Sequence, residues 1–266
     1  MKNNNCIQIR NINKSFSIGG KRKNKVLKNI NLEIREGEFI TIFGPSGCGK
    51  STLLNTLMGI ERPDSGTVHI LGKSIWDMNA DQRADFRKQN IGVVFQQQNW
   101  IKSLSVLENV ALNAQLLGYN QQESLQKAHK VIETMGMTRF EDFIPTELSS
   151  GEQQKIGLAR ALVSDPKIII ADEPTGNLDT ENGNEILRKL IKLAKEGITV
   201  ILVTHNPDHL GYSDTVAIMK DGYLIEKIKP EKDIYKRIKE RFAKTDTQQG
   251  EYILEDKDSE KKDYSE

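Results

Sequence analysis

Residues 44–51 form the stretch of this chain that is best suited to bind a triphosphate. They are Gly44, Pro45, Ser46, Gly47, Cys48, Gly49, Lys50 and Ser51. The glycines allow backbone N–H groups to turn towards phosphate oxygens with no Cβ in the way. We expect Lys50 to reach the β- and γ-phosphates and the Ser51 hydroxyl to bind Mg²⁺. The pattern predicts a nucleoside triphosphate site made of these eight residues and Thr52.

The segments on either side of the loop favour this interpretation over an ordinary glycine-rich turn. The apolar stretch 38–43 predicts a buried strand, and 52–58 predicts an amphipathic helix. Strand, glycine loop and helix follow one another in the order that a phosphate-binding loop requires. The helix N-terminus then adds its partial positive charge to the site.

Two adjacent carboxylates, Asp172 and Glu173, end a second predicted strand at 168–171. Ligands of open α/β sheets bind at the C-terminal ends of the strands. We expect Asp172 to hold Mg²⁺ through its water shell and Glu173 to orient or deprotonate the attacking water. An acidic pair can also cap a helix, and only together with the phosphate loop does this pair predict hydrolysis.

The overall composition is that of an ordinary globular protein. The 266 residues carry a formal net charge of +1, which gives no general electrostatic case for nucleic acid or an anionic membrane as partner. The longest apolar runs, such as 198–203, are far shorter than the ~20 residues that cross a bilayer. Only two cysteines occur and no apolar leader opens the chain, so we expect a reduced, cytoplasmic setting with Cys48 packed under the loop.

The order of predicted elements indicates a parallel sheet with helices on both faces. Alternating sequence up to about residue 42 predicts a small antiparallel sheet, and 106–135 predicts helices. Strand and helix signals then alternate along the segments 168–171, 181–195, 199–203 and 216–219. After Pro230 the composition becomes strongly charged, which predicts a short helix followed by disorder from about residue 245.

Several further motifs resemble those of the ATP-binding-cassette ATPases. Leu148 to Gln154 resembles the signature motif of that family, and 172–179 resembles its acidic strand end running into a dimer-contact loop. His205 follows an apolar strand like the family's switch histidine, and Phe95 and Gln96 resemble its glutamine loop. The resemblance covers about residues 7–227.

The resemblance implies a fold and a division of the chain. The expected fold is α/β: a P-loop NTPase core with a parallel sheet, an N-terminal antiparallel β-subdomain and a helical subdomain. The ATPase domain is expected to span 1–230, with the helical subdomain at about 97–160. Residues 231–266 are the charged tail.

The family resemblance also implies that two copies sandwich ATP head to tail. Ser149 and the Gly151 amide would then meet the γ-phosphate held by the other copy, at a helix N-terminus that favours anions. Asp179 would cross the interface and link the two sites. Ser149 followed by Glu152 is also a capping box, and both roles can hold together.

Three more roles follow from the resemblance. Gln96 would approach Mg²⁺ and the water, and His205 would contact the γ-phosphate and Glu173. Phe16 would stack on adenine, although tyrosine is commoner there and an ordinary core aromatic is the alternative. Gln97 and Gln98 are predicted to be plain polar loop residues.

Two positions depart from the family pattern. Lys155 stands where arginine is frequent, and Ser150 stands where glycine is typical. A side chain at 150 could crowd the phosphate or restrict the backbone. We therefore expect Ser150 to moderate turnover without abolishing it.

A transport role would require separate integral membrane permease subunits. We expect them to dock near Gln96 to Ile101, with Trp100 and Ile101 as apolar contacts. The alternative for Trp100 is packing between subdomains. The expected location is cytoplasmic, peripheral at the inner face of the cell membrane.

The motifs look most like the lipoprotein-release, macrolide-export and peptide-antibiotic-resistance branch of the family. Import of small solutes and assistance to cell division are the alternatives, together with a family member that acts on DNA or ribosomes. Members of the last group usually carry two cassettes or a long coiled-coil insertion, and neither is seen here.

Overall fold

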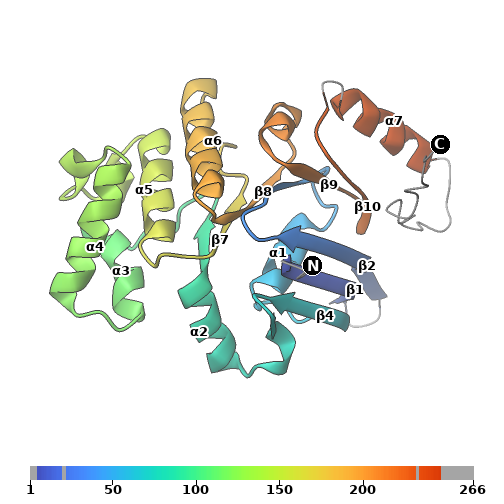
Figure 1. Cartoon of the computed structure of the whole chain (residues 1–266), viewed down its shortest axis with the longest axis horizontal. Coiled ribbons are helices and arrows are strands. Elements are labelled where there is room, and N and C mark those ends of the chain that lie inside the picture. The colour runs from blue at the N-terminus through green and yellow to red at the C-terminus, as the bar shows by residue number, and fades with distance from the viewer. Residues whose placement is uncertain (1–4, 20–21, 232–233, 247–266) are drawn as a thin grey trace, which may run out of the picture.

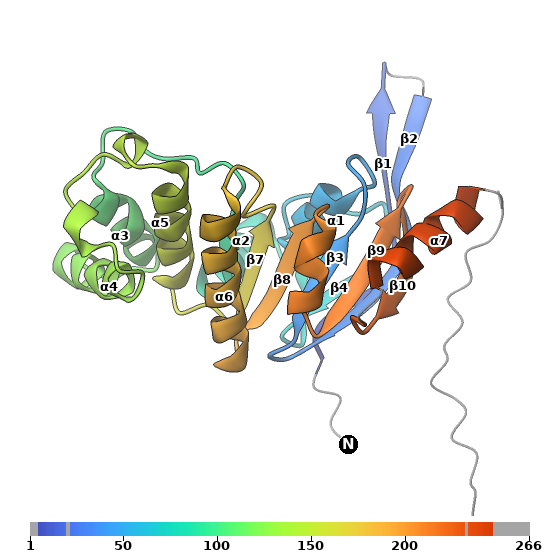
Figure 2. The same cartoon turned by 90° about the horizontal axis from the view of Figure 1, so that it is seen from above.

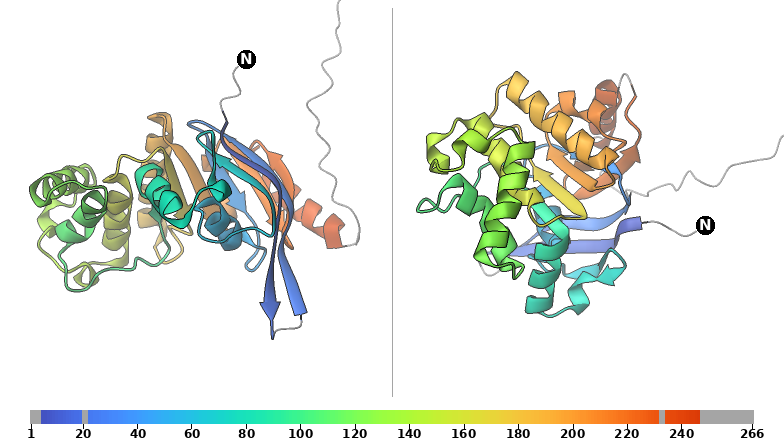
Figure 3. Two further views of the ribbon diagram at one scale, coloured as in Figure 1. Left: turned by 90° about the horizontal axis from the view of Figure 1, so that it is seen from below. Right: turned by 60° about the vertical axis from the view of Figure 1, so that its left-hand side comes forward.

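The computed structural model describes residues 5–19, 22–231 and 234–246 of the chain. Four strands form an antiparallel sheet in the order β2-β1-β4-β5. Their bounds are β1 Asn5–Ile18, β2 Arg22–Arg35, β4 Ser65–Ile70 and β5 Lys73–Ser74. The β1–β2 hairpin extends beyond the rest of this sheet (Figures 2 and 3). The predicted antiparallel β-subdomain is confirmed.

A second sheet has six strands in the order β10-β9-β3-β8-β7-β6. Its strands are β3 Phe39–Phe43, β6 Ile91–Val94, β7 Ile168–Asp172, β8 Thr199–Thr204, β9 Thr215–Lys220 and β10 Tyr223–Ile228. All neighbouring pairs are parallel except β10 with β9. The parallel core is therefore confirmed, with one antiparallel edge strand that the sequence reasoning did not predict.

Both faces of the six-stranded sheet are buried, as the near-continuous apolar strands require. In β7, Ile168 and Ile170 pack towards the antiparallel sheet, whereas Ile169 and Ala171 pack towards the helices. Helix α1, Lys50–Leu57, shares the first of these cores with both sheets. The helix that follows the phosphate loop is thus held between two sheets (Figure 1).

Four longer helices form the helical layer: α3 Val106–Leu116, α4 Gln121–Thr134, α5 Ser150–Leu162 and α6 Thr180–Lys195. Short 3₁₀ turns, η2 Thr138–Phe140 and η3 Pro145–Glu147, lead into α5. Ser105, Asn120 and Ser149 each start a helix with a capping box. These reciprocal bonds satisfy backbone donors that the first turn leaves unpaired.

Sequence reasoning missed helix α2, Ala80–Asn90, which follows the 3₁₀ turn η1 Ile75–Asp77. Its mean hydropathy is low and only Phe86 is buried, so the apolar period that predicts a helix is absent. Arg83 Nε donates to Gly59 O and Arg87 Nη1 donates to Met58 O. Helix α2 therefore supplies cations to the C-terminal end of α1, where the helix dipole favours them.

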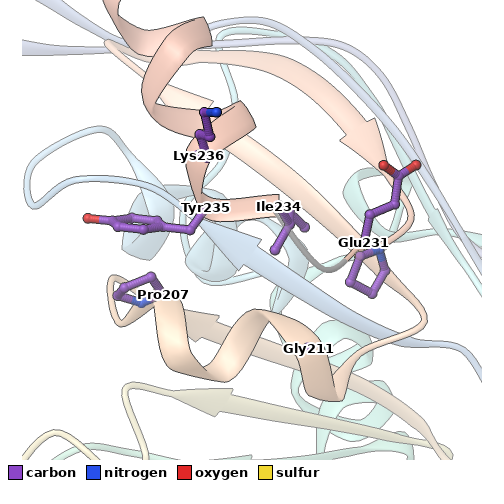
Figure 4. A pocket seen from close by; sticks show the side chains of 7 residues that line it. Pro207, Gly211, Glu231, Ile234, Tyr235 and Lys236 are labelled. Atoms are coloured by element: carbon purple, nitrogen blue, oxygen red, sulfur yellow. The ribbon is translucent and has the colours of Figure 1, made fainter.

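Helix α7, Ile234–Asp246, packs on the 3₁₀ helix η4, Pro207–Tyr212. Ile234 and Ile238 complete a small apolar core there. A groove of about 600 Å³ remains between the two helices, with Pro207 and Tyr235 on its walls (Figure 4). The predicted short helix is present, and the disorder expected beyond it falls on 247–266, outside the described residues.

No helix in the described parts of the chain has the length and apolar character needed to cross a bilayer.

Candidate active site

The parallel register brings the ends of four strands to one edge of the sheet. Phe43 pairs with Thr204, Asp172 pairs with Val203, and the last residue of β6 pairs with Ala171. Each strand therefore releases its next residues into the same space. The segments that leave this edge carry the phosphate loop, the acidic pair, His205 and Gln96.

The phosphate loop depends on glycine at positions where a side chain has no room. A Cβ on Gly44 would lie 2.3 Å from Met219 O, and one on Gly49 would lie 2.8 Å from Val26 O. Gly49 also has a φ of +106° and is the N-cap of α1, with no side chain capping the helix. The first N–H groups of α1 are thus left for a ligand, and an anion is what a helix N-terminus favours.

Lys50 is buried and turns back over the loop. Its Nζ donates to Gly44 O at 2.7 Å and to Pro45 O at 3.0 Å. Cys48 is buried beneath the loop, and burial raises the pKa of its thiol. Cys48 therefore acts as a small packing residue, as the sequence predicted, because a protonated buried thiol is unreactive.

Asp172 occupies the end of β7, half-buried beside two charges. Burial raises the pKa of its carboxyl, the neighbouring Glu173 raises it further, and Lys50 opposes both. A cation near Asp172 would offset this cost. Among the described residues no three His, Cys, Asp or Glu side chains form a metal cluster. An incomplete set of protein ligands around Asp172 fits Mg²⁺, because this ion usually keeps several waters and takes substrate phosphates as further ligands.

Glu173 and His205 form a pair between the ends of β7 and β8. The Nδ1 of His205 lies 2.7 Å from Oε1 of Glu173, and the Glu173 side chain is 16% exposed. Glu173 has a φ of +47°, a left-handed conformation that is costly for a residue with a Cβ. This conformation turns the backbone sharply at the strand end, where the Glu173 N–H donates to Val203 O. The turn brings the carboxylate to the imidazole.

Gln96 lies against the loop that follows the acidic pair. Its Nε2 is 2.6 Å from the position that a Cβ on Gly176 would take. A small cleft of about 170 Å³ opens beside it, lined by the glutamine loop, Ser150 at the start of α5 and residues 174–178. The loop that carries Gln96 thus faces both the segment after the acidic pair and helix α5.

The signature residues lie together at the starts of α5 and α6. Ser149 Oγ donates to Glu152 Oε2 at 2.7 Å, and this bond is the main cause that lowers the pKa of Glu152. Asp179 caps α6 by accepting from the Asn182 backbone N–H at 2.9 Å, and it also accepts from the Asn182 side-chain Nδ2 at 2.6 Å. A Cβ on Gly151 would lie 2.8 Å from Asn182 Cγ, so the two helix starts touch.

The phosphate loop and the signature residues do not share one site in the described chain. Helices α1 and α5 stand on opposite sides of β7 and α6 (Figures 1 and 2). Among the described residues, no hydrogen bond or ion pair joins Ser149 or Gly151 to residues 44–51. The strand ends and the start of α5 are therefore two separate surfaces of the described chain.

Comparison with known proteins agrees with this arrangement of motifs. A family model described as ABC transporter matches residues 27–176. The chain belongs to the ABC transporter family. An uncharacterised ABC transporter ATP-binding protein of Methanocaldococcus jannaschii is 42% identical over 83% of this chain and 98% of the relative.

Two relatives with a stated role and one solved structure are also similar to this chain. The lipoprotein-releasing system ATP-binding protein of Paramagnetospirillum magneticum is 37% identical over 84% of this chain and 99% of the relative. A macrolide export ATP-binding/permease protein of Chlorobaculum tepidum is 41% identical over 83% of this chain, and the match spans only 34% of that relative. A dimeric cassette bound to ADP and phosphate after hydrolysis matches with a TM-score of 0.78 at 37% identity, over 84% and 98% of the two chains. The cassette binds ATP and is an ATPase.

Phe16 lies on the cassette's antiparallel hairpin, near the start of α1. It pairs with Asn24 on β2, and Val26, two residues further on, touches Gly49. At ~3.3 Å per residue this places Phe16 within roughly 10 Å of the loop. Its ring is 38% exposed, so it does not belong to the buried core, and Lys14 Nζ lies 5.0 Å from the ring centre.

The prediction that Gln98 is a plain polar loop residue is wrong. Gln98 Oε1 accepts from Arg160 at 2.6 Å, and Arg160 lies 4.4 Å from the ring centre of Trp100. Trp100 also donates from Nε1 to Gln153 Oε1 at 2.9 Å. The Trp100 ring thus packs on α5, while Ile101 remains 43% exposed. Gln97 is exposed, as a loop residue should be.

Sequence reasoning also missed His209, which supports the loop that carries His205. His209 is buried, and burial lowers the pKa of its imidazole. Its Nδ1 lies 3.4 Å from Thr204 Oγ1 and its Nε2 lies 3.2 Å from Asn206 Nδ2. These contacts hold the residues on either side of His205. The only sequence signal was the placement of His209 four residues after His205, which by itself names no partner.

Proposed function

We propose that two copies of this cassette close around ATP and drive conformational change in separate integral membrane permease subunits. One observation carries the proposal: the start of α5 and the phosphate loop, both suited to phosphate, stand apart in one chain. A head-to-tail pair would bring each half to its complement. The dimeric relative bound to ADP and phosphate supports such a pair.

In this proposal the strand ends supply the first half of each site. The loop residues 44–52 hold the phosphates, with Lys50 released from its carbonyl partners to meet them. Bound Mg²⁺ would neutralise phosphate charge, and Ser51, Gln96 and Asp172 would hold it. Glu173 orients or deprotonates the attacking water, and His205 holds the Glu173 carboxylate beside the γ-phosphate. Phe16 stacks on adenine.

The second half comes from the other copy. Ser149 and the Gly151 amide offer donors at a helix start to the γ-phosphate across the interface. Asp179, at the start of α6 beside them, links the two sites. Because Gly151 and Asn182 touch, a shift of either helix start reaches the other.

The membrane partner is proposed to dock near Gln96 to Ile101, with the exposed Ile101 as one apolar contact. Trp100, whose ring packs against α5, is proposed as a second apolar contact. The macrolide export relative carries a permease in the same chain as its cassette, which supports a membrane partner. The cassette, residues 1–230 with a helical subdomain at about 97–160, would then sit peripherally at the cytoplasmic face. The similarity to lipoprotein-release and macrolide-export proteins favours an export or release role.

The Glu173→Gln variant tests the proposal. We expect it to bind ATP, to lose about 10²- to 10⁴-fold in turnover as general-base loss predicts, and to accumulate as a dimer in size-exclusion chromatography with ATP. Glu196→Gln, at the far end of α6, is the matched control and should behave as the parent. Parental turnover by Glu173→Gln would exclude Glu173 as the base, and a persistent monomer would exclude ATP-driven closure.

A further inference from the structure

We propose that Gln98 and Arg160 are positioning residues that fix the glutamine loop to the signature helix α5. The inference rests on the proposed function, because the loop serves one nucleotide of the dimer and the start of α5 serves the other. The side chains concerned are Gln98, Trp100, Gln153, Gln154 and Arg160, which we call the loop lock.

The first part of the lock holds the backbone directly before Gln96. Phe95 O accepts from Gln98 Nε2 at 2.8 Å and from Gln154 Nε2 at 2.9 Å. Gln98 and Gln154 also bond each other at 3.2 Å. Gln154 is 3% exposed, and a buried amide whose partners are removed costs free energy. The carbonyl before Gln96 is thus fixed to the middle of α5.

In the second part of the lock, two neutral oxygens of the loop accept hydrogen bonds from the cationic side chain of Arg160. Arg160 donates from Nη2 to Gln98 Oε1 at 2.6 Å and from Nη1 to Asn99 O at 3.0 Å. Its guanidinium also stacks on Trp100. None of the ion pairs found in the described residues includes Arg160, so the loop itself supplies its polar contacts. A planar, two-pronged donor suits two acceptors on one strand of chain.

Gly157 of α5 leaves room for the Gln98 side chain to reach the helix. A Cβ on Gly157 would lie 2.4 Å from Gln98 Cδ. The Gln98 amide therefore lies directly on helix backbone, and a side chain at position 157 would push it away. Gln96, two residues earlier, lies instead against Gly176 in the loop after the acidic pair.

The lock continues to the first residues of the signature. Trp100 Nε1 donates to Gln153 Oε1, and Gln153 Nε2 donates to Leu148 O at 2.9 Å. Leu148 directly precedes Ser149. Contacts therefore run without a break from the residue before Gln96 to the residue before Ser149, which ties the position of Gln96 at its own nucleotide to the position of Ser149 at the partner's nucleotide.

The experiment uses the full chain carrying Glu173→Gln, with Gln98→Ala added. We expect ATP affinity, measured with a fluorescent ATP analogue on dilute protein, to stay within about twofold. The ATP concentration for half-maximal dimer closure should rise roughly tenfold, within the usual range for coupling between sites. In the otherwise unaltered chain, Gln98→Ala should lower kcat more than it raises KM.

Gln97→Ala is the matched control, since Gln97 is exposed, is adjacent to Gln98 and makes no side-chain hydrogen bond to the other described residues. Trp100→Phe removes the bond to Gln153 while keeping an aromatic ring for Arg160 to stack on. It should give a smaller shift in the same direction without unfolding the chain. Failure of the Glu173→Gln parent to close would overturn the proposed function. Closure of the parent and of both lock variants at one ATP concentration would overturn this inference alone.

Discussion

The starts of α1 and α5 are both suited to bind phosphate, yet they are built differently. Helix α1 begins at a left-handed Gly49 with no side-chain cap and no acidic residue in its first turn. Helix α5 begins at Ser149 in a complete capping box with Glu152. The first start leaves its donors to a ligand, whereas at the second the capping box satisfies the N–H groups of Ser149 and Glu152. This difference is what we expect if the start of α1 binds ATP first and the start of α5 meets phosphate only when a second copy packs against it.

The largest effect on stability and ATP binding should come from a substitution in the phosphate loop that precedes α1. Gly44→Ala places a Cβ 2.3 Å from Met219 O, so we expect ~1–3 kcal/mol of destabilisation and no measurable ATP binding. Gly118→Ala, between α3 and α4, is the control, because no atom lies within 4 Å of its Cβ although its φ is +96°. It should cost only ~1 kcal/mol of strain. Thermal unfolding and ATP titration measure both.

Ser149→Ala breaks the α5 side. The lost cap should cost ~1 kcal/mol of stability, while dilute chain binds ATP as before and turnover at dimer-forming concentrations falls at least tenfold. Ser105→Ala removes the same type of capping box from α3 and should cost similar stability with turnover intact. Equal turnover in the two variants would mean that Ser149 is a cap and nothing more.

Asp172→Asn separates stability from function at the catalytic edge. The pKa of Asp172 is raised in the folded chain, so its ionised form destabilises the folded state at neutral pH and this cost disappears as pH falls and the carboxyl is protonated. We expect Asp172→Asn to gain roughly 0.5–2 kcal/mol at pH 7, to lose that advantage near pH 4, and to lose Mg²⁺-dependent turnover. Urea unfolding at both pH values checks this, and an equal gain at both would contradict it.

Ser150→Gly should give the smallest effect and sharpens the α5 side. Ser150 is exposed as the first helical residue of α5, and its φ is not among the positive values. Glycine is therefore not required there by the backbone, and the remaining effect is crowding of the phosphate. We expect a modest rise in steady-state ATPase activity with at most ~1 kcal/mol of lost stability. An unchanged rate would count against any moderating role of Ser150.

The elements predicted best were those with a strong local signal. The strands at 39–43, 168–172 and 199–204 are mostly apolar runs, and the phosphate loop is recognisable by itself. Helix α2 and strand β10 were missed because the first is polar all round and the second is an edge strand. Their places are set by partners distant in sequence, which no local pattern records.

The sequence alone determined the family, the ATPase chemistry and the types of residues in the site, because those depend on motifs whose spacing is short. Only the tertiary structure decided that Glu173 reaches His205, that Asp172 is burdened by burial, and that Gln98 is held by Arg160. These contacts join residues 32 to 62 positions apart in the chain. Their distances follow from strand register and helix packing, which local residue preferences do not specify.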